Sequence, residues 1–147
     1  MQASLEAVDA LVPAVITALR ASTTLNNLLD TGTAKGVHDG DAPNPTQGAQ
    51  PTKYIVVRSP SASAEGVFGS VGANCALELH VWHPLPGESE VRSIVAAIGV
   101  ALEGVALSLG GGFRHWSSAC FLIGSFNDTQ AKPPMKHGVV RYEARVQ

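Results

Sequence analysis

Two stretches of the chain repeat apolar residues with the period of a helix. In residues 4–21 the apolar residues share one face and Pro13 lies off it, which predicts a helix that the proline kinks or splits. Residues 88–103 carry a clearer stripe, with Glu88 and Glu90 near the expected N-terminus, where carboxylates stabilise a helix. The stripes are Leu5, Val8, Val12, Val15, Ile16 and Leu19, and Val91, Ile94, Val95, Ile98 and Leu102.

Four other segments show the pattern of strands. Residues 53–58 are rich in β-formers, and residues 74–82 alternate between apolar and polar positions, as half-buried strands do. Residues 116–126 are apolar at both parities, which predicts a central strand. Residues 139–146 alternate again. Serine, alanine and glycine dominate residues 59–72, which we interpret as the extended tip of a long hairpin between the first two strands, mobile in the free protein.

The order of these elements predicts the fold class. Residues 30–52 form a long loop rich in glycine and proline. The chain then reads helix, loop, strand, strand, helix, strand, strand. This order predicts a single α+β domain over residues 1–147, with a four-stranded antiparallel sheet, two helices packed on one face, and long loops. The opposite face is expected to carry Glu78, His80, Arg141, Glu143 and Arg145.

Composition excludes several classes of function. The chain has 147 residues, 15% of them charged, with a net charge of −2 and a pI near 6.2. A dedicated nucleic-acid binder usually has a basic stripe or a strongly basic pI, so this class is not expected. No run of about 18 apolar residues occurs, and no basic segment precedes the first apolar stretch. We therefore expect neither a transmembrane helix nor a signal peptide.

No residue pattern predicts a metal or cofactor site. His80 and His83 form an H-x-x-H spacing, but residues three apart on a strand point to opposite faces, so the two cannot easily share a metal. Gly110–Gly112 follow a predicted helix and lead into a strand, whereas a phosphate-binding loop opens a helix and carries lysine with serine or threonine. We expect these glycines to form a turn.

Nucleophilic catalysis is not predicted either. Ser117, Ser118 and Cys120 lie in the third strand without the G-x-S-x-G turn that exposes a nucleophile. Cys75 and Cys120 belong to no metal-binding or redox motif, and we expect both to be buried, reduced thiols. The sequence thus predicts a protein that is not an enzyme.

The candidate functional residues are those of a contact surface. Arg141, Glu143 and Arg145 alternate on one face of the last strand, and Glu78 lies on the same face of its sheet neighbour. Such a pattern fits either a solvated face or a contact between subunits, since opposite charges fix the register of an interface. Val67 and Phe68 are isolated large apolar residues in the predicted hairpin tip, and we expect them to dock onto a partner.

Several local features, in this order, resemble the tail terminator family of long-tailed bacteriophages, also called tail completion or tail-to-head joining proteins. The similarity spans most of the chain, although residues 59–72 and 104–112 look long for the family. The matching features are the N-terminal helix, Asp41-Ala42-Pro43, the strand entered through Pro51-Thr52-Lys53-Tyr54, the strand Leu77 to Trp82, an alanine-rich helix with an early Arg92, and the charged last strand Arg141 to Val146.

The resemblance implies a structural virion protein. Such a protein is made in the host cytoplasm and located at the tail–head junction, where it forms a homo-hexameric ring. The ring caps the tail tube, ends its polymerisation and joins it to the head. Its expected partners are the tail tube protein and a head completion or connector protein. Genomic DNA passes through the channel without specific binding. The family supplies no catalytic residue, cofactor or metal.

Two alternatives remain open from the sequence. One is another neck or tail component of similar build, such as a head completion or tail tube protein. The other is a small ligand-binding or enzymatic α+β domain. A tail tube protein would stack into long tubes, and an enzyme would have a buried pocket with convergent histidine and acidic groups.

Overall fold

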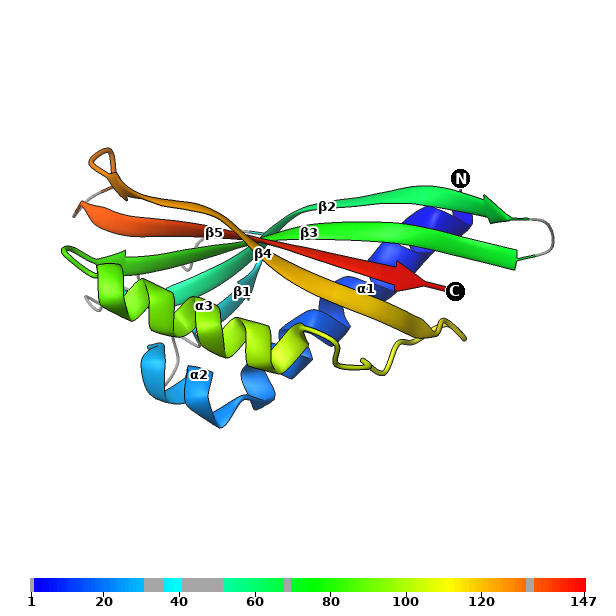
Figure 1. Cartoon of the computed structure of the whole chain (residues 1–147), viewed down its shortest axis with the longest axis horizontal. Helices are drawn as coiled ribbons and strands as arrows, with labels where there is room; N and C mark the ends of the chain where they lie inside the picture. Colours follow the sequence, from blue (N-terminus) through cyan, green and yellow to red (C-terminus); the bar gives the residue numbers. More distant parts are fainter. Residues whose placement is uncertain (1, 31–35, 41–51, 68–69, 132–133) are drawn as a thin grey trace.

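The computed structural model describes residues 2–30, 36–40, 52–67, 70–131 and 134–147, and the side chains of residues 2–4, 65–67 and 70–71 lie outside that description. These residues form three helices and five strands (Figure 1). The helices are α1 (Gln2–Ala21), α2 (Thr23–Leu28) and α3 (Glu88–Leu102). The strands are β1 (Val37–Asp39), β2 (Tyr54–Val67), β3 (Ser70–Pro84), β4 (His115–Asp128) and β5 (Met135–Val146).

The strands form one mixed sheet in the order β1-β2-β3-β5-β4. β2 with β3, β3 with β5, and β5 with β4 are antiparallel, whereas β1 runs parallel to β2. The α+β class is confirmed, but the prediction of four antiparallel strands is wrong because β1 adds a fifth, parallel strand. β1 has only three residues and lies in the glycine- and proline-rich loop segment, so it is too short to show an alternating pattern.

β4 occupies an edge of the sheet, which corrects the prediction of a central strand. It pairs with β5 on one side only. The apolar side chains of β4 point to both faces of the sheet, but they are therefore not buried on both. Large exposed side chains gather on this strand instead: Trp116, Phe121, Leu122, Ile123 and Phe126.

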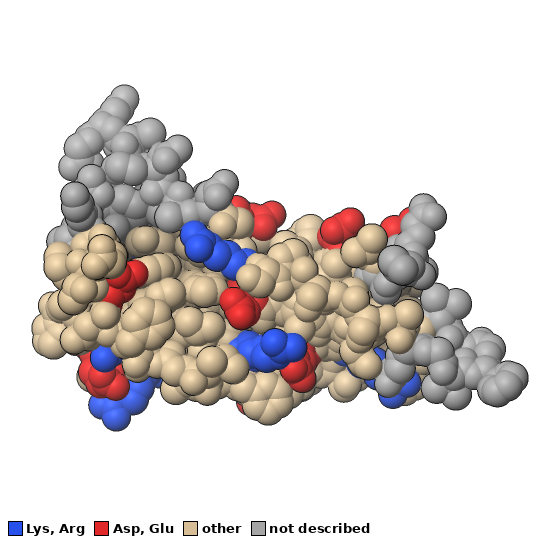
Figure 2. Space-filling view, turned by 90° about the horizontal axis from the view of Figure 1, so that it is seen from above, with Lys and Arg blue, Asp and Glu red and all other residues tan. Residues whose placement is uncertain are grey.

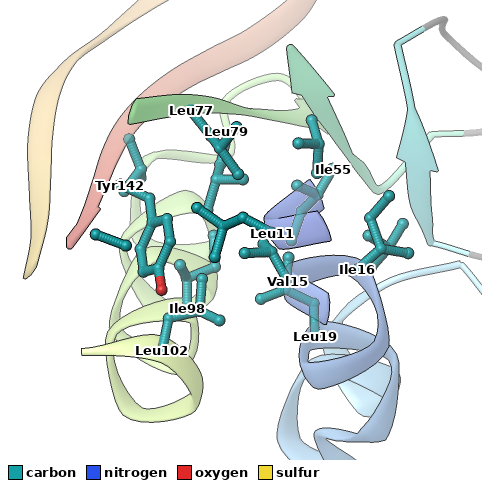
Figure 3. Packing of buried hydrophobic residues seen from close by; sticks show 14 of the residues in the cluster. Leu11, Val15, Ile16, Leu19, Ile55, Leu77, Leu79, Ile98, Leu102 and Tyr142 are labelled. Atoms are coloured by element: carbon teal, nitrogen blue, oxygen red, sulfur yellow. The ribbon is translucent and has the colours of Figure 1, made fainter. Parts of the chain in front are cut away.

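The helices cover one face of the sheet: in Figure 1, α2 and α3 lie below the strands and α1 crosses β2 and β3. Helices and sheet enclose a single main core (Figure 3). Leu77 and Leu79 of β3 point into this core together with Tyr142 of β5, and all three are fully buried. α1 packs against β2 and β3, and α3 packs against β3, β4 and β5. Pro13 lies exposed inside α1, and the helix continues through it as one segment. Burial of one helix face thus holds α1 together despite the proline.

The β2–β3 hairpin is longer than its two predicted strands. The ladder runs from the Tyr54–Trp82 pair to the Val67–Ser70 pair, so most of the predicted tip is paired. An irregularity between Arg58 and Ser61 inserts one extra residue into β2, and Ser59 there has φ of 52°. Serine, alanine and glycine carry little apolar patterning, which is why the sequence did not show these strand ends. Mobility of the tip stays a prediction.

The close packing of α3 on β5 predicts the effect of a glycine substitution. A Cβ on Gly138 would lie 2.8 Å from Cγ1 of Val91, whereas a Cβ on Gly124 of β4 would have nothing within 4 Å. We expect Gly138→Ala to lower the free energy of unfolding by about 1–3 kcal/mol through overpacking, as measured by urea unfolding. Gly124→Ala is the matched control and should change stability little. Equal stability of the two variants would contradict this packing.

Candidate functional site

The face of the sheet without helices carries the charged residues that the sequence singled out. Leu77 and Leu79 face the helices, so alternation places Glu78 and His80 on the opposite face. Glu78 lies opposite Arg141 in the ladder, and Glu143 and Arg145 follow on β5 at the same parity. Seen from above the sheet, acidic and basic side chains alternate over a mostly uncharged surface (Figure 2). The structure therefore brings these four predicted residues together on one face.

Charges on this face are partly balanced within the chain. Arg141 donates from Nε to Oε1 of Glu143 at 2.6 Å, and both side chains are about half exposed. Oε2 of Glu78 lies 3.0 Å from Nε2 of His80. An exposed ion pair of this kind contributes at most about 1 kcal/mol to stability. Its arrangement sets the pattern of charge that a partner would meet.

A broad depression of about 660 Å³ hollows the same face over the hairpin half of the sheet. Small side chains, among them Ser61, Ala76 and Ala119, line it beside Arg141 and Arg145. It is open to solvent, and Glu143 is the one carboxylate among its described lining residues.

Histidine and aromatic rings form a cluster at the other half of this face. Nδ1 of His80 lies 2.7 Å from Nε2 of His137. The rings of His137 and Trp82 stack with centroids 3.8 Å apart, and Tyr54 stacks beyond Trp82 at 6.3 Å. Burial, reinforced by the charge of a protonated His80, lowers the pKa of His137 to about 4. His137 is thus a neutral hydrogen-bonding partner in this cluster near neutral pH.

The two histidines of the H-x-x-H spacing lie apart, as the alternation predicts. His80 joins the cluster with His137, while Nδ1 of His83 lies 2.9 Å from the carbonyl oxygen of Pro84 at the end of β3, where the sequence predicted a turn. In the part of the chain that the structure describes, no group of three or more metal-ligating side chains is positioned to hold an ion. The sequence missed His137, because its partner His80 is 57 residues away along the chain.

The serine and cysteine candidates have structural contacts. Oγ of Ser118 donates to the carbonyl oxygen of Leu102 at 2.8 Å and accepts from the backbone N of Gly104, so it fixes the end of α3. Ser117 points to the opposite face, beside Arg145 in the ladder. Both cysteines are free thiols; Cys75 is buried as predicted, whereas Cys120 is only partly buried because β4 lies at the edge of the sheet. Burial raises the pKa of Cys75, and burial together with the Glu103 carboxylate raises that of Cys120 to about 11, so the thiolate nucleophile is disfavoured.

Val67 and Phe68 cannot be placed as contact residues. Phe68 and the side chain of Val67 lie outside the described residues. Five of the large exposed apolar side chains among the described residues are on β4, and the sequence did not show them as surface. Phe121 is 49% exposed, Leu122 52% and Ile123 62%. In the sequence, apolar residues occupy both the odd and the even positions of this strand. A central strand that is buried on both faces shows the same pattern, so the sequence could not distinguish the two.

A groove of about 400 Å³ adjoins this edge on the helix side. It runs between α3 and β4 and is lined by Val95, Val100, Leu122 and Cys120 among others. Val100 is 83% exposed at its rim. The groove and the β4 edge thus form one continuous apolar surface, of a kind that marks an interaction site in soluble proteins.

Comparison with known proteins identifies the family of the chain. The sequence matches the family described as "Tail completion protein gp17" over residues 13–147. The chain belongs to this family. The predicted resemblance is thereby confirmed, and this tail completion protein is assigned to a family of structural proteins of phage tails. Curated protein sequences contain no match to the chain.

The fold of the tail completion protein also occurs in solved structures. A chain of the "Virion of native gene transfer agent (GTA) particle" superposes with a TM-score of 0.73 at 23% identity, covering 95% of this chain and 96% of that one. A second solved chain reaches a TM-score of only 0.44 at 13% identity, covering 87% and 94%. The first match shows a shared fold over nearly the whole chain.

The surfaces described above are the functional candidates of the tail completion protein. None of its described helices has the length and apolar character needed to cross a membrane. The charged face, its depression and the apolar β4 edge are the exposed features that the described residues form on the surface. They suit assembly with other proteins.

The neutral state of His137 predicts how stability depends on pH. In the unfolded chain its pKa is about 6.5, and in the fold it is lowered to about 4 by burial first and then by His80. The stability that His137 contributes is therefore complete above about pH 6.5 and is lost as pH falls toward 4. We expect the drop in free energy of unfolding between pH 7 and 4.5 to be about 1–2 kcal/mol smaller in His137→Gln than in the wild type.

Urea unfolding at both pH values measures this difference. His83→Gln, which removes a partly buried imidazole at the end of β3, is the control for loss of a histidine outside this cluster. If the free energy of unfolding of His137→Gln fell by as much as that of the wild type, His137 would have the same pKa in the folded and the unfolded state, and the prediction would be wrong.

Proposed function

We propose that this tail completion protein closes the end of the phage tail tube as a homo-hexameric ring. The ring ends polymerisation of the tube and joins it to the head, at the tail–head junction of the virion. Its partners are then the tail tube protein on one side and a head completion or connector protein on the other. The observation that carries the proposal is the apolar, uncharged β4 edge, because a chain with such an edge requires a covering neighbour.

A ring uses two different surfaces of one subunit. Identical subunits that meet head to tail close into a ring when the rotation between them closes. The β4 edge is one such surface, and the charged face with Glu78, Arg141, Glu143 and Arg145 supplies complementary charges that fix orientation. Because acidic and basic groups are interspersed there, the channel would not hold DNA tightly by its phosphates.

A gene deletion tests the function. Particles produced without this protein should contain tails of uncontrolled length that are not attached to heads, and supplying the wild-type chain should restore joined particles. Electron microscopy of purified particles should then show six copies at the tail end. Tails of normal length without the protein, or five, seven or twelve copies, would contradict the proposal. Long tubes formed by the purified chain alone would favour a tail tube protein.

Charge reversal on the helix-free face tests the interface. We expect Arg141→Glu combined with Arg145→Glu to reduce incorporation into particles about tenfold or more, because like charges then meet across the contact. Thermal unfolding should show a smaller effect for Arg141→Glu alone, within about 1 kcal/mol, since Arg141 is about half exposed whereas Arg145 is partly buried. The exposed Arg92 on α3 provides the control Arg92→Glu, which should assemble normally. Normal assembly of the double variant would exclude this face from the contact.

A further inference from the structure

Two open edges of the sheet suggest how neighbouring copies meet. Among the described residues, no strand covers the outer side of β4 along residues 120–127, although the backbone N of Gly104 donates to the carbonyl oxygen of Ser118 just before them. At the opposite edge, β1 pairs only with Ile55–Val57 of β2. In the described part of the chain, the outer side of β2 is therefore open from Ser61 toward the hairpin tip.

We propose that the open edge of β4 in one copy pairs with the open edge of β2 in the next copy, so that the sheet continues from subunit to subunit. This inference rests on the proposed ring and names its contact. The partner is a second copy of this chain because each copy offers both edges, and a head-to-tail contact between them leaves neither open within a closed ring.

Strand polarity supports the pairing. The three steps from β2 through β3 and β5 to β4 are all antiparallel, so β2 and β4 run in opposite directions. Rotation about the ring axis preserves the direction of each strand along that axis. β4 of one copy and β2 of the next therefore meet as antiparallel strands, the more stable ladder.

The side chains of the two edges are complementary in size, and neither edge is charged. Residues 120–127 of β4 (CFLIGSFN) and residues 59–64 of β2 (SPSASA) contain no charged residue. Exposed edges of natural sheets usually carry a charge, a proline or a bulge that prevents pairing. Neither stretch has a charge, and Pro60 and the extra residue of β2 lie before the open positions Ala62 and Ala64. The bulky Phe121, Leu122 and Ile123 would lie against small serine and alanine side chains, which leave room for them.

Within one subunit, the open stretch of β4 and the open stretch of β2 lie at different positions along the strand direction. Through the ladder, Gly124 lies level with Val139, His80 and Val56, whereas the open part of β2 begins near Ser61. Four strand spacings of about 4.8 Å span about 19 Å. A strand tilt of about 40°, as in closed barrels, staggers strands by about 16 Å over this width, or about five residues. A stagger of this size toward the hairpin tip brings Gly124 to about the level of Ala62.

Backbone geometry identifies which N–H groups would donate across the contact. In the first half of β2, the backbone groups of Ile55 and Val57 point away from β3: the N–H of Ile55 donates to Gly36, and the carbonyl of Val57 accepts from Gly40. The extra residue after Arg58 changes the alternation, so that the backbone groups of Ala62 and Ala64 point away from β3. On β4 the backbone carbonyl of Ser118 points away from β5, and so do the backbone groups of every second residue after it. The irregularity between Leu122 and Gly124 changes this alternation, so that the backbone groups of Ser125 point away from β5. Proline at an outward position removes an edge donor and leaves the ladder within the subunit intact.

Ser125→Pro and Ala64→Pro therefore test the two edges separately. Each should lower incorporation into purified particles at least tenfold, measured by quantitative mass spectrometry after complementation of the deletion. The matched variants Ser125→Ala and Ala64→Ser keep their N–H groups and should incorporate like the wild type. Ile123→Lys, which keeps every donor but places a charge at the edge, should also fail. Leu5→Lys, at an apolar side chain of α1 that is 56% exposed, is its control.

The outcomes separate this inference from the proposed function. Circular dichroism and thermal unfolding identify any variant that does not fold, and Ile123→Lys tests the edge should a proline variant unfold. Wild-type levels of incorporation for Ser125→Pro or for Ile123→Lys would contradict the proposed pairing of β4 with β2 but not the proposed ring. Normal incorporation of Ala64→Pro would exclude β2 as the partner edge. Absence of the wild-type chain from the tail end would instead overturn the proposed function.

Discussion

Burial of one face of the β2–β3–β5–β4 sheet under two helices is the constraint on which the rest of the molecule depends. Leu77, Leu79 and Tyr142 alternate inward and meet α1 and α3 in a single core. Because side chains alternate along a strand, this choice also assigns every intervening residue to the other face. The charged pair Arg141–Glu143, the His80–His137 contact and the depression beside Arg145 are all consequences of that one assignment.

Apolar periodicity predicted the elements that build this core. The stripe of α3 and the alternation of β3 and β5 depend on burial of a single face, so each appears in the sequence alone. β4 was misplaced because the sequence shows that a residue is apolar but not whether it is buried: Phe121 and Leu122 are about half exposed here. β1 was missed because its pairing with Ile55–Val57 depends on tertiary contacts and not on its own pattern.

The candidate site was predicted only in part. Glu78, Arg141, Glu143 and Arg145 share a face, as their parity required. The His80–His137 pair could not be predicted without the β3–β5 register, which brings together residues far apart in sequence. The family match over residues 13–147 supports an assembly protein, and it explains why the noteworthy surfaces are open ones. The exposed apolar edge of β4 is the most prominent of these open surfaces among the described residues.

The extra residue between Arg58 and Ser61 has a consequence for how this hairpin can vary in length. Before it, Ile55 and Val57 point to the helices, and after it the inward position passes to Ala62, opposite the buried Cys75. An insertion of a single residue here would turn the outer half of β2 over and send serine into the core. Related chains can therefore lengthen or shorten this arm most easily by matched pairs of residues at its end, where both strands grow together and every side chain keeps its face.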